Sequence, residues 1–273
     1  MGKGDGDRVV RCERGHLHWG RYGAAGLLPV SDGHVLLQHR AWWTMGGGTW
    51  GTFGGARDSH EDAVTAALRE TAEESTLDPG LVSPLGILRE DHGGWAYDTV
   101  IATVERTPPV GPASGETEDA AWVPVGEVHL RPLFGPFAKA WPRVREHLRR
   151  PVLVVDCANV MGSRPDGWWR DRRGAATRLR DALAGLGDVP GLGGFDVAFP
   201  EVVLVVEGQA RGVESVAGVR VVSAEGSGDD TIAELARGGA RTVVTADRGL
   251  RARCQEAGAE VVGPRWLLDR VAY

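Results

Sequence analysis

The chain has 273 residues, and at about 150 residues per domain this length corresponds to roughly two domains. Apolar residues make up 42% of it and charged residues 25%, which excludes disordered, collagen-like and disulfide-scaffold proteins. The 31 basic and 37 acidic residues give a net charge of −6, so the surface as a whole does not coat a polyanion, although a local basic groove is compatible with this charge. The chain lacks an apolar run of about 18 residues and a signal-peptide stretch, so we expect a cytoplasmic protein with no membrane contact.

The cysteines predict a reduced protein. There are three, Cys12, Cys157 and Cys254, and no two of them have the CxxC spacing. An odd number at these spacings indicates neither a disulfide framework nor a zinc knuckle.

The first half of the chain is predicted to contain short strands and two helices. Three segments rich in Val, Ile and Leu are predicted to be strands, over 22–30, 34–39 and 97–104. Apolar residues at helical spacing predict a helix over 61–75, and a second helix is expected over 137–148. We expect Ser59 and Asp62 to form a capping box at the start of the first helix.

The pattern changes at residues 149–151, where continuous apolar runs replace alternating ones. The runs PVLVVD, EVVLVVE, VRVVS, RTVVTAD and AEVVG are typical of strands buried on both faces. Helices are predicted over 174–186, 230–237, 250–257 and 264–272, with a glycine-rich loop over 184–195. Alternating strands and helices predict an α/β domain with a parallel sheet flanked by helices. We therefore expect two domains, residues 1–150 and 151–273.

The most informative segment of the first half is GGARDSHEDAVTAALRETAEEST. Glu70, Glu73 and Glu74 are three and four positions apart, so a helix gathers their carboxylates on adjoining parts of one turn. They repel one another unless a hard divalent cation such as Mg²⁺ lies among the oxygens, and Arg69 can orient and partly neutralise them. The alternative is a solvated helix face, which is the better interpretation for an isolated string of glutamates.

The full spacing favours the cation site, because the segment resembles the signature of the Nudix hydrolases, GX5EX7REUXEEXGU. The matching residues are Gly55, Glu61, Arg69, Glu70, Glu73, Glu74 and Leu77. With the neighbouring strands, the resemblance covers about residues 15–150. It implies the Nudix α/β/α sandwich with a mixed sheet. It also implies hydrolysis of the diphosphate in a nucleoside triphosphate or in a nucleoside diphosphate linked to another group.

Two positions depart from the family pattern. Thr76 stands where the signature has glycine, and Thr52 and Phe53 replace the Leu-Pro often found before the paired glycines. Neither change removes a metal ligand. A β-branched residue adopts the left-handed conformation of a helix C-cap poorly, so we expect the helix to end differently here.

The resemblance also implies roles for individual residues. The expected ligands of Mg²⁺ or Mn²⁺ are the carbonyl of Gly54 and the carboxylates of Glu70, Glu73 and Glu74. Glu61 supports this cluster, and Arg69, Glu73 and Glu74 are expected to be catalytic. Bound metal neutralises phosphate oxygens and lowers the pKa of a water that attacks phosphorus.

A further catalytic base or ligand is expected from a later loop. Glu116 in GETEDAAWVPV is our first choice and Glu118 our second, with an ordinary surface acid as the alternative. The partner of this domain is expected to be a nucleotide-type small molecule. Tryptophans near predicted strand ends are candidates for stacking on its base, although tryptophan more often packs in a core; they are Trp42, Trp43, Trp50 and Trp95.

Acidic residues of the second half stand just after its apolar runs. They are Asp156, Glu207, Asp229, Asp230 and Asp247. Open parallel sheets form their sites at the carboxyl ends of the strands, and converging carboxylates there can hold two cations that clamp a phosphodiester. The alternative for any single aspartate is that it caps the following helix.

Three short blocks, VVDCANVMG, SGDDTIAELA and VVTADRGLR, resemble those of the NYN branch of the PIN-like ribonucleases. This resemblance covers about residues 151–273. It implies that Asp156, Asp229 or Asp230, and Asp247 bind metal, and that Asn159 positions a ligand or a phosphate. For Glu207, the following glycine indicates only that the strand ends.

The segment DGWWRDRR places aromatic rings beside guanidinium groups, a combination that suits single-stranded RNA. Trp168, Trp169 and Arg170 are the candidate contacts, and a packed tryptophan pair with solvated arginines is the alternative. The sequence thus favours a Nudix pyrophosphohydrolase followed by a metal-dependent ribonuclease. Two alternatives stay open, a second domain that binds nucleic acid without catalysis and a Nudix domain that senses its ligand without turnover.

Overall fold

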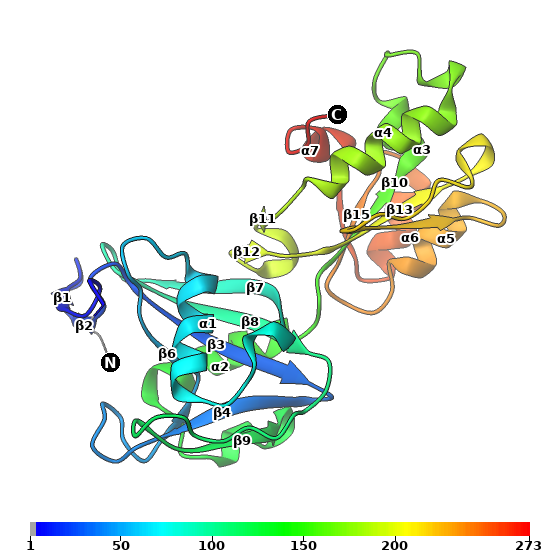
Figure 1. Cartoon of the computed structure of the whole chain (residues 1–273). Coiled ribbons are helices and arrows are strands. Elements are labelled where there is room, and N and C mark those ends of the chain that lie inside the picture. The colour runs from blue at the N-terminus through cyan, green and yellow to red at the C-terminus, as the bar shows by residue number, and fades with distance from the viewer. Residues whose placement is uncertain (1–3) are drawn as a thin grey trace. The chain divides into compact units, whose positions relative to one another are not determined.

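The computed structural model describes residues 4–273 and resolves the chain into two compact units, which divide between Leu148 and Arg149 (Figure 1). Among the described residues, no helix is both long and apolar enough to cross a membrane. Cys12, Cys157 and Cys254 are all buried, and none of them forms a disulfide bond in the described part of the chain.

The first unit is built on a mixed sheet in which β7, β8, β3, β4 and β5 are successive neighbours, while β6 also pairs with β3 and β9 with β4. Its strands are β1 (Val9–Arg11), β2 (Leu17–Trp19), β3 (Ala24–Ser31), β4 (His34–Arg40), β5 (Trp50–Gly51), β6 (Phe53–Ala56), β7 (Val82–Asp91), β8 (Ala96–Val104) and β9 (Thr117–Pro124). Its α-helices are α1 (Ala63–Glu74) and α2 (Gly135–Val144), with 3-10 helices η1 (Pro79–Leu81), η2 (Val125–Leu130) and η3 (Arg145–His147).

Strand β3 forms the centre of this sheet, and all eight of its residues are buried. It pairs parallel with β8 and antiparallel with β6, and its end forms a hairpin with β4. Helix α1 packs on β3 and β6, and Figure 1 shows α2 on the opposite face of the sheet. A mixed sheet with a helix on each face agrees with the fold that the Nudix resemblance implies.

The sequence predicted these elements with errors at their ends and in the polar strands. The three strands predicted in the first half are β3, β4 and β8, but β7 and β9 were not predicted. The capping box was wrong: Asp62 caps α1, its carboxylate accepting from the Thr65 amide at 2.7 Å, whereas the Ser59 amide donates to Asp5. Because Asp62 is the N-cap, the helix begins at the next residue, Ala63.

The second unit is a five-stranded sheet with every strand parallel, in the order β14-β13-β10-β15-β16. These strands are β10 (Val152–Asp156), β13 (Glu201–Val206), β14 (Val219–Ser223), β15 (Arg241–Val244) and β16 (Glu260–Val262), and β11 (Val189–Pro190) with β12 (Val197–Ala198) forms a short hairpin. The helices are α3 (Cys157–Gly162), α4 (Arg172–Ala184), α5 (Gly228–Leu235), α6 (Arg248–Glu256) and α7 (Pro264–Leu268), with 3-10 helices η4 (Trp168–Arg170), η5 (Leu192–Gly194) and η6 (Gly208–Ala210).

All five apolar runs are therefore strands of one parallel sheet, as predicted. Helices α3 and α4 cover one face and α5 and α6 the other (Figure 1). On the α5 and α6 face the core contains Val154, Val203, Ile232 and Leu250. The chain order of the strands reverses between β10 and β15, and ligands of such sheets bind at the carboxyl ends beside a reversal of this kind.

Candidate functional site

The two glycines before α1 each leave space that a side chain would fill. Strand β6 runs so close to β3 that a Cβ on Gly54 would collide with the carbonyl oxygen of Ala25. A Cβ on Gly55 would lie 2.6 Å from the carboxyl carbon and from both carboxylate oxygens of Glu70. Gly55 therefore provides the hollow that the Glu70 carboxylate occupies.

Arg69 is held between the sheet and the helix. Its Nε and Nη2 donate to the two carboxylate oxygens of Glu61 at 2.7 and 2.9 Å, and Nη2 also donates to the carbonyl of Ala56 at 3.0 Å. The Glu61 side chain is 3% exposed, and the hydrogen bonds from Arg69 lower its pKa. Arg69 Nη1 reaches Glu70 at 2.9 Å. The guanidinium thus binds both carboxylate oxygens of Glu61 but only one carboxylate oxygen of Glu70.

The other carboxylates are poorly compensated. Burial raises the pKa of Glu70, and it raises the pKa of Glu74 to about 7, with the charge of Glu70 as the next cause. Glu74 is 5% exposed and accepts a hydrogen bond from the Gly54 amide at 3.1 Å. Glu73 lies at the rim, its side chain 43% exposed and 3.4 Å from Arg69. One buried acid, one partly buried acid and one exposed acid on one turn make a negatively charged hollow.

This set of donors fits a hard divalent cation. The donors are carboxylate oxygens, which Mg²⁺ and Mn²⁺ prefer, and the glycine hollow holds one carboxylate against the sheet. Burial disfavours their charged form, and a cation among them would favour that form. Glu70, Glu73 and Glu74 are therefore the residues that could hold a metal.

Gln38 is part of this site, although sequence reasoning did not single it out. It is fully buried in β4, and a hydrogen bond from it opposes the rise in the pKa of Glu74. Its Nε2 donates to Thr117 Oγ1 at 2.8 Å, and its Oε1 accepts from Arg40 at 3.1 Å. The signal was a polar residue inside the apolar run HVLLQHR, because a buried amide needs partners.

The later acids lie at the start of β9. Glu116 directly precedes the strand, is partly buried, and its carbonyl accepts from the amide of Ala41. Glu118 is exposed, with a carboxylate oxygen 3.5 Å from Nδ1 of His39. The neighbour of Glu116, Thr117, bonds to Gln38, which connects this segment to Glu74.

The departures from the family pattern have local explanations. Helix α1 ends at Glu74, and its C-cap residue Ser75 has an extended backbone, so the helix does end without a left-handed residue. Thr76 instead exchanges two hydrogen bonds with Gly111, each 2.9 Å long. Thr52 Oγ1 lies 2.8 Å from the buried hydroxyl of Tyr97, and Phe53 is fully buried in the core.

Only two of the four candidate tryptophans of the first unit offer free rings. Trp42 is 81% exposed and Trp43 56%. Trp50 is buried and stacked on His39, with 4.7 Å between ring centroids, and Trp95 is stacked on His18 at 3.9 Å. Stacking on a nucleobase is therefore sterically simplest for Trp42 and Trp43.

In the second unit, four acids gather at the carboxyl ends of the strands. Asp156 ends β10 and is 6% exposed, and burial followed by the charges of Asp229 and Glu207 raises its pKa. Burial and the charges of Asp247 and Glu207 raise the pKa of Asp229. The cluster lies beside the point where strand order reverses.

Capping and clustering are not exclusive here. Asp156 accepts from the amide of Asn159 at 3.0 Å and from Thr245 Oγ1 at 2.8 Å, and Asp247 caps α6. Asn159 in turn accepts from the amide of Ala246 at 2.9 Å, which joins the ends of β10 and β15.

Glu207 and Asp230 differ in their relation to the acidic cluster. Glu207, which the sequence interpretation set aside, accepts from the Gly228 amide at 2.8 Å and belongs to the cluster by its charge. Asp230 forms an ion pair with Arg253 at 2.7 Å. Of the two adjacent aspartates, Asp229 is thus the one that faces the cluster.

The aromatic and basic segment forms the 3-10 helix η4. Trp169 is 53% exposed, and Arg170 is exposed too. Trp168 is partly buried, in edge contact with Trp169 and with the guanidinium of Arg172 5.4 Å from its ring centroid. Of the three candidate contacts, the ring of Trp169 and the guanidinium group of Arg170 are accessible to a ligand.

Comparison with known proteins identifies the first unit. A family model described as "NUDIX domain" matches residues 20–144. A "Putative 8-oxo-dGTP diphosphatase 3" of Mycobacterium tuberculosis is 43% identical over 154 residues, which cover 52% of this chain and 70% of that protein. A "Nucleoside triphosphate pyrophosphatase/Nudix hydrolase fusion protein" of Bifidobacterium longum is 41% identical over 152 residues, or 52% of this chain. This chain spans only 32% of that fusion protein. A solved structure, a Nudix hydrolase from M. smegmatis named RenU, is 38% identical over 52% of this chain and 94% of its own, with a TM-score of 0.49.

Proposed function

The chain belongs to the Nudix family, and we propose from this membership that its first unit hydrolyses the diphosphate of a nucleoside triphosphate or of a related nucleoside diphosphate derivative. The observation that carries the proposal is that Glu70, Glu73 and Glu74 share one helical turn beside the glycine hollow, where burial raises the pKa of both Glu70 and Glu74. Mg²⁺ or Mn²⁺ bound there supplies charge for the phosphate oxygens and a water of lowered pKa.

The chain's own residues prepare this chemistry. Arg69 fixes Glu61 with two hydrogen bonds and holds one oxygen of Glu70, so the acids keep their positions on one turn. Gly54 donates to Glu74, which orients that carboxylate toward the hollow. Glu116, at the start of β9, is our candidate for the group that takes up the proton of the attacking water.

The first substrate to test is 8-oxo-dGTP, because the relative from M. tuberculosis bears that activity in its name. The purified chain would be incubated with 8-oxo-dGTP, the ordinary nucleoside triphosphates, ADP-ribose and dinucleoside polyphosphates, each with Mg²⁺ or Mn²⁺, and the products weighed. Release of a nucleoside monophosphate supports the proposal. Failure of every member of this panel with both metals would contradict it.

For the second unit we propose an NYN/PIN-like domain that cleaves RNA with metal held by Asp156, Asp229 and Asp247. The observation in favour is that Asp156 and Asp247 follow β10 and β15 at the reversal of strand order, and that the charge of Asp229, in the first turn of α5, acts on Asp156. Two cations between them would clamp the attacking and leaving oxygens of a phosphodiester.

The alternative for this unit is binding of single-stranded RNA without cleavage, through Trp169 and Arg170. Incubation of the full chain with short labelled RNAs and Mn²⁺ separates the two. Cleavage that Asp156→Asn abolishes supports the nuclease, whereas intact RNA that remains bound favours the binding module.

A further inference from the structure

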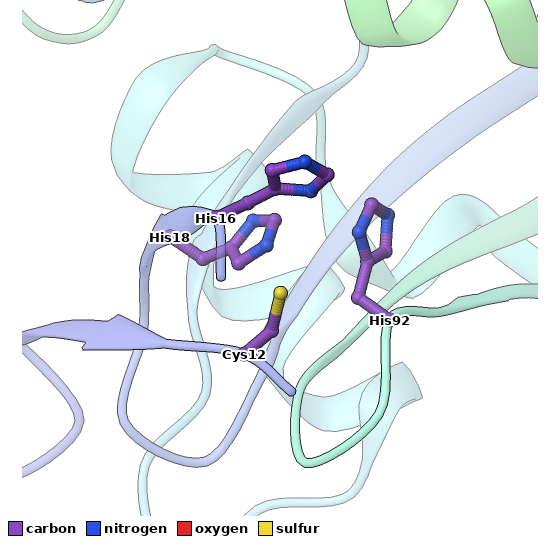
Figure 2. Close-up of side chains that lie close together, drawn as sticks. All are labelled: Cys12, His16, His18 and His92. Atoms are coloured by element: carbon purple, nitrogen blue, oxygen red, sulfur yellow. The ribbon is translucent and has the colours of Figure 1, made fainter. Parts of the chain in front are cut away.

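Four metal-ligating side chains meet in the first unit, apart from the carboxylates of α1. Cys12 follows β1, His16 and His18 lie before and in β2, and His92 lies in the turn between β7 and β8. One ligand atom from each residue lies within 4.8 Å of those of the other three. Figure 2 shows the thiol and the three imidazole rings directed toward one another.

The backbone positions these residues by itself. The Cys12 amide donates to the carbonyl of His16 at 3.0 Å, closing the β1–β2 hairpin around a turn at Gly15 with φ of 82°. The Glu13 amide donates to the carbonyl of Gly93 at 2.9 Å, which ties the hairpin to the turn that carries His92. Cys12 and His92 are 80 residues apart in sequence, and the backbone thus holds their segments together in advance of any ligand.

The imidazoles lack the partners that buried nitrogens need. Nε2 of His18 and Nδ1 of His92 are both buried without a hydrogen-bond partner. The ring centroids of His18 and His92 are 4.7 Å apart in an edge contact, and Trp95 stacks on His18 with 3.9 Å between centroids. A buried nitrogen left unpaired destabilises the fold, and two of them in one cluster point to a ligand that both would bind.

We propose that Cys12, His16, His18 and His92 form a zinc site. Thiolate and imidazole are together the donors that Zn²⁺ prefers, whereas the Mg²⁺ of a carboxylate cluster prefers oxygen. Tetrahedral ligands at about 2.0–2.3 Å from the metal lie roughly 3.3–3.7 Å apart, so the present spacing requires only small side-chain rotations to close.

The burial and charge of the donors suit this ion. Cys12 is buried, His18 and His92 are partly buried, and His16 is exposed, so the site lies at the surface with its thiol innermost. One thiolate and three neutral imidazoles leave a Zn²⁺ complex with a single positive charge. Four protein ligands fill a tetrahedral shell and leave no position for substrate.

The site is therefore structural and separate from the proposed hydrolytic centre. It would fasten the hairpin of β1 and β2 to the turn between β7 and β8, which the Glu13 amide and the Arg14 side chain join by hydrogen bonds to the carbonyls of Gly93 and Asp91. Small hairpins are marginally stable by themselves, so a metal clip at this position has a stabilising role.

Metal analysis of the full chain tests the proposal. The purified protein is reconstituted with Zn²⁺, dialysed against excess Mg²⁺ and measured by mass spectrometry for zinc. We expect one zinc per chain. Substitution with Co²⁺ should give intense tetrahedral d–d absorption and a thiolate-to-cobalt charge-transfer band. A wild-type chain that retains no zinc and shows neither spectral feature would overturn the proposal without reference to any variant.

Variants locate the ion. Cys12→Ser should abolish the charge-transfer band, and both it and His92→Gln should weaken zinc affinity at least about a hundredfold, because one of four ligands is lost. The matched controls Cys254→Ser and His129→Gln should retain one zinc and the full spectrum. Glu74→Gln should retain it as well, since that residue lies in the carboxylate cluster. Equal zinc content in Cys12→Ser and wild type would refute the assignment.

Discussion

Glu74→Gln should stabilise the metal-free first unit above neutral pH while removing metal-dependent hydrolysis. The Glu74 carboxylate is 5% exposed beside Glu70, and its pKa rises to about 7 because burial disfavours the charge. Glutamine has nearly the same shape, carries no charge, and can still accept the hydrogen bond from Gly54.

The magnitude follows from linkage. A rise in pKa from the ordinary 4.5 to about 7, at about 1.4 kcal/mol for each tenfold change in proton affinity, corresponds to about 3 kcal/mol. Because the pKa is raised in the folded state, protonation stabilises the fold fully below pH 4.5, and this stability is lost as the pH rises through about 7. Glu74→Gln should therefore match wild type near pH 4.5 and exceed its free energy of unfolding by up to about 3 kcal/mol at pH 8.

The assay is urea unfolding of the full chain in EDTA. Unfolding of the first unit is monitored by hydrogen exchange of the peptide that contains α1. Glu73→Gln is the matched control, since it removes a carboxylate that is 43% exposed from the same turn. Both variants should lose at least about a hundredfold in Mg²⁺-dependent turnover, because transition-state charge loses its metal. Only Glu74→Gln should gain stability, and saturating Mg²⁺ should shrink that gain. A Glu74→Gln chain no more stable than wild type at pH 8 in EDTA would refute the reasoning.

Three further outcomes are expected. Gly55→Ala would set a methyl group 2.6 Å from the Glu70 carboxylate, so turnover should fall at least about tenfold by kinetic assay, while Gly115→Ala, which meets nothing within 4 Å, should not change it. Asp247→Asn should abolish RNA cleavage and leave nucleotide hydrolysis intact, and loss of both activities would show that the two units are not independent. EDTA should stop nucleotide hydrolysis and Mg²⁺ restore it; hydrolysis that persists in EDTA would exclude the proposed metal chemistry.

Residue spacing predicted the parts of the molecule that depend on local pattern. The apolar runs of the second half became one parallel sheet, because strands buried on both faces need continuous hydrophobicity. The acids of α1 lie on one turn because three- and four-residue spacing dictates it. Strands β7 and β9 were missed since their polar residues interrupt the alternation, and pairing with β8 and β4 supplies what propensity lacks.

Long-range partners could not be predicted from spacing. The polar Gln38 inside an apolar run signals that its side chain needs partners, but its link to Thr117 depends on the pairing of β4 with β9, which the local pattern does not reveal. The cluster of Cys12 with His92 was likewise invisible, because cysteine spacing alone was considered and the last ligand comes from a distant turn. Such sites depend on topology, which a one-dimensional pattern does not encode.

Titration of the full chain with Mn²⁺, monitored by electron paramagnetic resonance, tests most directly whether the carboxylates of one helical turn hold the cation for diphosphate hydrolysis. We expect Glu70→Gln to lose the tightest Mn²⁺ site of the first unit together with nucleotide turnover. The Mn²⁺ sites of the second unit, identified by their loss in Asp156→Asn, should be unchanged in Glu70→Gln. Identical Mn²⁺ titrations of wild type and Glu70→Gln, with turnover preserved, would contradict it.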